Sequence, residues 1–382
     1  MREGEQVSPL ELFFDLVFVL AITQCTQLMS DDPTWEGLAR GLLVLGMLWW
    51  AWVGYSWLTS VVDPEDDAVR LVIFAAMGAM LLVALAVPEA FGDLGLLFAL
   101  AYAVVRYSQI GLFVIASRDA PGLRRSVVGL AMSTTLGVGL LVGASFLDGT
   151  EQGALWALAL ALDMGGPLFI NSEGWRLVPA HFAERHGLIL IIALGESIVA
   201  IGVGVGAGLS FGQGVAAVVG IALACGMWWL YFDVVALVAA RRLERAAVGR
   251  DQNEMARDSY SYLHFPMVAG IVLVALGLKK TLEHVEDPLK LVPAVALLGG
   301  LAAYLLAHVL FRYRHVHTVN TRRAGLAVIL VALLPAAIEV PALATVAVVT
   351  ALVWALIVYE THSYGPARER VRRENFAPEA SG

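Results

Sequence analysis

Residues 10–29 read LELFFDLVFVLAITQCTQLM, an apolar run with Glu11 at its start and a second carboxylate, Asp15, in its interior. Crossing the hydrocarbon core of a bilayer takes about 20 residues of helix. Runs of this kind recur along the whole chain and lack the alternation of barrel strands. Because only helices and closed barrels satisfy their own backbone groups in lipid, the sequence predicts an all-α, polytopic membrane protein.

The composition supports this prediction. Hydrophobic residues make up 59% of the 382 residues, and only 15% are charged, against about 25% in a typical soluble domain. The mean hydropathy is +0.75. No basic stripe with interleaved aromatic residues is present, which argues against a nucleic-acid partner. The two cysteines, Cys25 and Cys225, fall in separate apolar segments and are interpreted as packed thiols.

Hydropathy and turn signals together predict about twelve transmembrane spans. With residue 1 in the cytoplasm, 20 of the 25 lysines and arginines fall on the inner side, 4 on the outer side and one within a span. This asymmetry predicts that both termini are cytoplasmic. No cleavable signal peptide is predicted, so the first run stays as a membrane helix. The predicted spans are 10–29, 38–60, 69–87, 94–117, 125–146, 152–170, 187–207, 213–239, 259–278, 291–311, 323–339 and 343–360.

The two halves of the chain resemble each other in sequence. Residues 1–183 and 184–362 are predicted to be two six-helix repeats, and residues 363–382 a basic, disordered cytoplasmic tail. Six spans per half make the repeats parallel, with a pseudo-two-fold axis along the membrane normal that brings the first and seventh helices to a central interface. The matching features are Asp15 and Glu196, Gly46-Met47 and Gly226-Met227, Leu82–Leu85 and Leu273–Leu276, Arg124-Arg125 and Arg322-Arg323, and Asp163 and Glu360.

Ionisable residues within the spans are candidates for a transport path, because a charge at membrane depth needs a partner, water or a neutral state. Glu11 and Asp15 share a helix face, where two acids attract a cation. Alternatively, Glu11 lies at the interface and Asp15 caps a helix or pairs with an arginine. Glu196 lies deep in its span among small residues, and its structural alternative is a salt bridge to Arg106. Arg106 is either an anion contact or a counter-ion for an acid. Asp163 completes the set of path candidates.

The segment between the sixth and seventh spans, residues 171–186, is rich in polar groups. It is predicted to be a hairpin that serves as a cytoplasmic gate or as a positive-inside anchor. No H-E-x-x-H zinc signature occurs, and neither a metal nor another cofactor is predicted. No P-loop, nucleophile elbow, Rossmann fingerprint or haem-attachment motif was found, although these absences do not exclude an enzyme. The gate candidates are His181, Glu184, Arg185 and His186.

Several of these stretches together resemble the bacterial low-temperature-requirement A (LtrA) family. The resemblance covers residues 8 to about 360 and implies a bacterial inner-membrane protein linked by name to growth in the cold, without implying a molecular activity. The stretches are Glu11–Val19, Trp49–Tyr55, His181–Ile189, Leu194–Ile198 and Tyr260–Pro266.

A second resemblance concerns architecture alone. Two six-helix repeats that each open with an aromatic–acid motif are similar to non-canonical potassium channels, whose motif is Phe-Ser-Asp and whose first helices line the pore. Here the motifs are Phe14-Asp15 and Gly195-Glu196, without the serine before the acid.

Three functions are compatible with the sequence. The first is a channel or transporter for an ion or small solute, with acidic residues of the first and seventh helices lining the path. The second is a membrane enzyme that acts on lipid or quinone through the 171–186 segment. The third is a structural or sensory protein for growth in the cold. The expected partners are the lipid bilayer and an ion or small solute.

Overall fold

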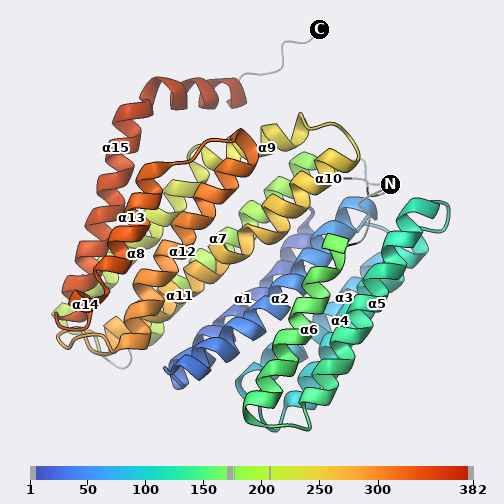
Figure 1. Ribbon diagram of the computed structural model, residues 1–382, viewed down its shortest axis with the longest axis horizontal. Coiled ribbons are helices and arrows are strands. Elements are labelled where there is room, and N and C mark those ends of the chain that lie inside the picture. Colours follow the sequence, from blue (N-terminus) through green and yellow to red (C-terminus); the bar gives the residue numbers. More distant parts are fainter. Residues whose placement is uncertain (1–5, 170–174, 176, 206–207, 377–382) are drawn as a thin grey trace. The chain divides into compact units, whose positions relative to one another are not determined.

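The computed structural model describes residues 6–169, 175, 177–205 and 208–376, and every regular element within them is helical (Figure 1). Ten of the described helices or helical pairs are long and apolar enough to cross a membrane. The predicted all-α, polytopic membrane fold is therefore confirmed, whereas the count of twelve spans stays a prediction. The two predicted spans outside these ten are 152–170 and 323–339.

Contacts between Cα atoms divide the chain into two compact units. The first contains Met1–Ile192 and Ala246–Ser261, and the second contains Ala193–Arg245 and Tyr262–Gly382. The first unit is built from α1 (Pro9–Asp31), α2 (Trp35–Val61), α3 (Asp67–Ala86), the short η1 (Val87–Glu89), α4 (Gly95–Ala116), α5 (Pro121–Ala144), α6 (Gly149–Phe169), the beginning of α7 (Pro179–Val205), α10 (Arg250–Ala256) and most of the π-helical η2 (Arg257–Tyr262).

The second unit begins within α7 and contains the remaining helices. These are α8 (Phe211–Phe232), α9 (Val235–Glu244), α11 (His264–Glu283), α12 (Leu291–Val316), α13 (Thr321–Ala332), α14 (Leu334–Ala337) and α15 (Ala342–Phe376).

Each of the two units contains a similar set of neighbouring helix pairs. In the first unit α3 packs on α4, α4 on α5, α5 on α6, and α2 on α6. In the second unit α11 packs on α12, α12 on α13, α13 on α15, and α8 on α15. These pairs correspond in chain order, as a duplication predicts, and the duplication itself stays a prediction.

The seventh helix begins earlier than hydropathy predicts. It starts at Pro179 rather than at residue 187, because proline is well suited to the first turn of a helix, where its missing N–H has no helical partner. Residues 179–186 are therefore helical and not part of a hairpin loop. Residues 171–174 and 176 of the predicted hairpin lie outside the described residues.

Three further boundaries differ from the predicted spans. The predicted span 213–239 is divided, since α8 ends at Phe232 and α9 begins at Val235. The predicted span 323–339 is also divided between α13 and α14, because Pro335 cannot donate the backbone hydrogen bond that a continuous helix needs. Residues 363–376, part of the segment predicted to be disordered, continue α15, which contains Pro366 and bends sharply in Figure 1.

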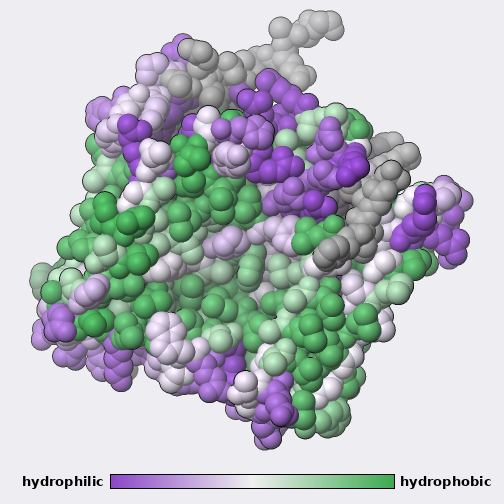
Figure 2. All heavy atoms as spheres, in the orientation of Figure 1, coloured by the Kyte–Doolittle hydropathy of each residue, from purple (hydrophilic) through white to green (hydrophobic). Residues whose placement is uncertain are grey.

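Large hydrophobic side chains cover the outside of the helices. Leu71, Met132, Leu136 and Val328 are each more than half exposed, and Figure 2 shows hydrophobic residues over the middle of the helices with hydrophilic residues near their ends. Exposed apolar surface on this scale is unfavourable in water and favourable in lipid. The apolar outer surface of the helices is therefore suited to contact with the hydrocarbon core of a bilayer.

Candidate functional site

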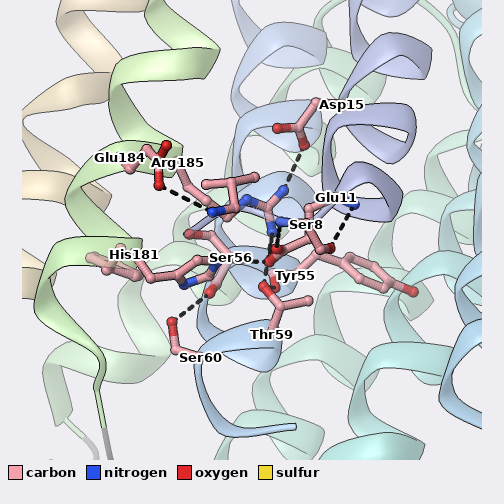
Figure 3. A network of polar contacts seen from close by, with 12 residues as sticks. Ser8, Glu11, Asp15, Tyr55, Ser56, Thr59, Ser60, His181, Glu184 and Arg185 are labelled. Carbon is pink, nitrogen blue, oxygen red and sulfur yellow. Dashed lines mark hydrogen bonds and ion pairs between the residues drawn. The ribbon is translucent and has the colours of Figure 1, made fainter. Parts of the chain in front are cut away.

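A buried polar cluster joins the first two turns of α1 and α7 within the first unit (Figure 3). Glu11 and Asp15 lie one turn apart on α1, and His181 and Arg185 lie one turn apart on α7. Spacings of four residues place each pair on one helix face. All four side chains are at most 2% exposed. The structure thus combines two of the path candidates with two of the gate candidates in one site.

Glu11 has two structural roles, one for each carboxylate oxygen. Its Oε2 accepts from the Ser8 backbone N–H at 2.9 Å, while Ser8 Oγ accepts from the Glu11 backbone N–H at 3.3 Å, which forms a capping box. Its Oε1 lies 2.9 Å from His181 Nε2 and 3.5 Å from Arg185 Nη1. The Glu11 carboxylate is buried in the protein, and the alternative in which Glu11 lies at the membrane interface stays a prediction.

Asp15 is held by Arg185 and by a tryptophan of α2. Its Oδ1 accepts from Arg185 Nη2 at 2.6 Å and from Trp52 Nε1 at 2.8 Å. Arg185 Nη1 also donates to Thr59 Oγ1 at 2.9 Å, and the guanidinium lies 5.4 Å from the centre of the Trp52 ring. The alternative in which Asp15 pairs with an arginine is confirmed. A single guanidinium thus serves two buried carboxylates.

Three polar atoms of the cluster have no hydrogen-bond partner among the described residues. They are Asp15 Oδ2, His181 Nδ1 and Arg185 Nε, and all three are buried. A carboxylate oxygen without a donor is costly in a protein interior. Asp15 Oδ2 is therefore the carboxylate oxygen of the cluster that lacks a donor among the described residues.

The other two gate candidates point elsewhere. Glu184 is exposed, and its Oε2 accepts from the Val7 backbone N–H at 3.1 Å. His186 is buried, its Nδ1 lies 2.8 Å from the Phe182 carbonyl oxygen, and its ring contacts the Trp52 and Tyr260 rings at 4.9 and 5.2 Å. His186 therefore packs within an aromatic group, and the cluster contains only His181 and Arg185 of the four.

Arg106 and Asp163 form a second buried network in the first unit. Arg106 Nη2 lies 2.8 Å from Asp163 Oδ1, which also accepts from Thr134 Oγ1 at 2.7 Å, and Asp163 Oδ2 accepts from the Tyr102 hydroxyl at 3.1 Å. Arg106 Nη1 donates to Gln109 at 2.6 Å. The predicted counter-ion role of Arg106 is confirmed, and the acid it serves is Asp163.

The second unit holds a comparable ion pair that the sequence pattern did not single out. Arg323 binds Glu360 with two hydrogen bonds, Nε to Oε1 at 3.0 Å and Nη2 to Oε2 at 2.8 Å. Glu360 had been matched to Asp163, and this match was the available signal. Glu196 lies farther along α7 in this unit and is 2% exposed. Its equivalence to Asp15 stays a prediction.

Trp52 and Thr59 complete the cluster and were also missed as site residues. Both lie on α2. A buried indole N–H needs an acceptor. The sequence signal for Trp52 was therefore the presence of an intramembrane carboxylate that can accept from it. No sequence signal marks Thr59. Among the described residues, no group of three or more His, Cys, Asp or Glu side chains is arranged to hold a metal ion.

The fold and the buried charges define a multi-pass α-helical membrane protein with ionisable groups inside its helix packing. Residues 6–358 match the family described as Bacterial low temperature requirement A protein (LtrA), and the chain belongs to this family. An uncharacterized protein of Rhizobium meliloti (strain 1021) is 32% identical over 308 residues, which cover 77% of this chain and 74% of the relative. No solved structure matches the chain.

Proposed function

We propose that this protein is a channel or transporter for an ion or small solute and that the Glu11–Asp15–His181–Arg185 cluster binds and releases the transported or coupled cation. The observation that supports the proposal is Asp15 Oδ2, a buried carboxylate oxygen without a donor among the described residues. Intramembrane acids are costly to insert and are a feature of ion pathways and proton relays. Asp15 is accordingly the residue that we assign to cation exchange.

The composition of the cluster favours reversible binding. Arg185 is divided between two carboxylates, at 2.6 Å from Asp15 and 3.5 Å from Glu11. His181 offers a second protonation position at Nδ1, which has no partner in the described part of the chain. A proton can therefore be held by a carboxylate or by the imidazole with small movements of side chains. This property suits proton-linked transport.

Burial argues for transport rather than headgroup chemistry. His181 and Arg185 are both 0% exposed, whereas an enzyme acting on lipid needs its catalytic groups open to the headgroups. In our proposal, Glu196 supplies the second acid of the path. The charge-balanced Arg106–Asp163 pair supports the packing of helices within the first unit. The proposed setting is the bacterial inner membrane with both termini in the cytoplasm, where α1 and α7 begin.

Flux through proteoliposomes tests the proposal. The full chain is reconstituted in vesicles that hold a dye sensitive to H⁺, Na⁺ or K⁺, and a gradient of the matching cation is imposed on each preparation. We expect one gradient to dissipate faster than in protein-free vesicles and Asp15→Asn to abolish that difference. Asp31→Asn is the matched control, because Asp31 is an exposed aspartate of the same helix.

Two results contradict the proposal. The first is the absence of flux for all three cations with the correctly folded chain. The second is a confirmed flux that Asp15→Asn leaves unchanged, which assigns the cluster to structure alone.

A further inference from the structure

A cavity of about 400 Å³ lies within the second unit, separate from the cluster described above. It is bordered by the end of α8, by α9, by the end of α12 and by residues of α13 and α15. This volume falls within the range of about 300–1,000 Å³ that is typical of small-molecule sites. The apolar part of its wall includes Leu230, Val235, Val238 and Phe311.

His308 borders this cavity and holds a buried hydrogen-bond donor. Arg323 Nη1 lies 2.7 Å from His308 Nδ1. A guanidinium only donates hydrogen bonds, so Nδ1 accepts, and the neutral ring carries its proton on Nε2. His308 is 1% exposed, and Nε2 is buried without a partner among the described residues. The geometry therefore fixes an N–H donor that no described acceptor satisfies.

Trp229 provides a second donor in the wall of the same cavity. Its Nε1–H is buried and also lacks an acceptor in the described part of the chain. An indole nitrogen donates and never accepts. Two residues that border one cavity thus each hold a buried donor without an acceptor in the described part of the chain. A ligand with two acceptor atoms can satisfy both donors.

The charges around the cavity also favour an anion. Both acids in its wall are ion-paired to arginine: Glu360 with Arg323, and Asp233 with Arg368. Arg312, in contrast, donates from Nε to the Thr318 hydroxyl oxygen at 3.0 Å and forms no ion pair with a carboxylate of the described residues. The wall thus offers a positive charge and two N–H donors beside an apolar surface.

We propose that this cavity binds an organic monoanion with an apolar body, a carboxylate whose oxygens accept from His308 Nε2 and Trp229 Nε1. Arg312 supplies the compensating charge, and the apolar body packs against Val235, Val238 and Phe311. This inference does not depend on the proposed transport function, because binding is measured without flux. A carboxylate of this kind has two sources, an acyl chain of the membrane and a soluble carboxylic acid of the cytoplasm.

Isothermal titration of the full chain in detergent tests the site with three probes. Octanoate represents the acyl source, benzoate represents the soluble source, and 1-octanol is the uncharged match of octanoate. We expect octanoate or benzoate to bind, the tighter of them identifying the source, and octanol to bind at least about tenfold more weakly, as expected when charge-assisted hydrogen bonds are lost. Binding of octanol as tight as that of octanoate, or binding of neither carboxylate, overturns the proposal.

Two conservative variants locate the binding. Trp229→Phe keeps an aromatic ring and removes the N–H, and Arg312→Gln removes an exposed charge; each is expected to weaken carboxylate binding about tenfold. Trp228→Phe is the matched control, since Trp228 neighbours Trp229, is 44% exposed and does not border the cavity. Unchanged binding in Trp229→Phe, with the thermal unfolding of the variant equal to that of the wild type, contradicts the site.

Discussion

Arg185 and Asp15, which are 170 positions apart in the sequence, form a buried ion pair with 2.6 Å between Nη2 and Oδ1. This contact connects α7 to α1 inside the first unit. The same guanidinium approaches Glu11, so its loss affects two acids at once. The first two predictions concern this pair.

Replacement of Arg185 by Gln is predicted to destabilise the protein strongly. Removing one partner of a buried ion pair leaves an uncompensated charge and costs about 3–5 kcal/mol. The measurement is the free energy of unfolding in mixed detergent. The double variant Arg185→Gln with Asp15→Asn is expected to recover part of this loss, because the charge of Asp15 is then absent. Equal stability of the single and double variants contradicts the ion pair.

Replacement of Trp52 by Phe is predicted to lower stability more modestly. The change keeps an aromatic ring but removes the N–H that donates to Asp15 Oδ1 at 2.8 Å. A hydrogen bond to a charged group contributes about 1.5–3 kcal/mol. Trp35→Phe serves as the control, since Trp35 is 55% exposed. If Trp52→Phe and Trp35→Phe lower the free energy of unfolding equally, loss of the hydrogen bond to Asp15 does not explain the destabilisation by Trp52→Phe.

The general fold was predictable from sequence because apolar runs of membrane length leave few alternatives. The start of α7 was not predictable in this way, because a hydropathy profile treats polar residues as facing solvent. His181 and Arg185 lower the local hydropathy, yet both are buried against α1 and α2. A hydropathy profile therefore starts the predicted span at residue 187, after the polar residues of the cluster, whereas the helix begins at Pro179.

The candidate site was only partly predictable. Glu11 and Asp15 were placed on one face because a spacing of four residues is a local property of a helix. Their partners on α7 depend on contacts between distant segments, for which one sequence offers no direct signal. For the same reason the sequence did not identify the acid that pairs with Arg106. The alternative that it offered was Glu196, whereas the partner in the structure is Asp163 of α6.

Labelling of engineered cysteines is predicted to show the orientation of α5 that a cytoplasmic N-terminus requires. Asp119 and Asp148 are exposed residues at opposite ends of α5, and the arginine distribution places Asp119 inside and Asp148 outside. In a chain with Cys25 and Cys225 replaced by alanine, Asp148→Cys should react with an impermeant maleimide in cells with a permeabilised outer membrane. Asp119→Cys should react only after lysis. The reverse pattern contradicts the orientation.

Replacement of Gly300 by Ala is predicted to destabilise the second unit, because α11 and α12 approach closely at this residue. A Cβ at Gly300 would lie 2.6 Å from Leu273 Cβ and 2.9 Å from the Gly270 carbonyl oxygen, so the helices must move apart. Such overpacking costs about 1–3 kcal/mol. Gly299 is the matched control, since its nearest contact would be Val295 Cγ1 at 3.5 Å. Thermal unfolding should therefore show a lower melting temperature for Gly300→Ala and an equal or higher one for Gly299→Ala, because alanine favours helix over glycine by about 1 kcal/mol. Equal melting temperatures for the two variants contradict the close approach of α11 and α12.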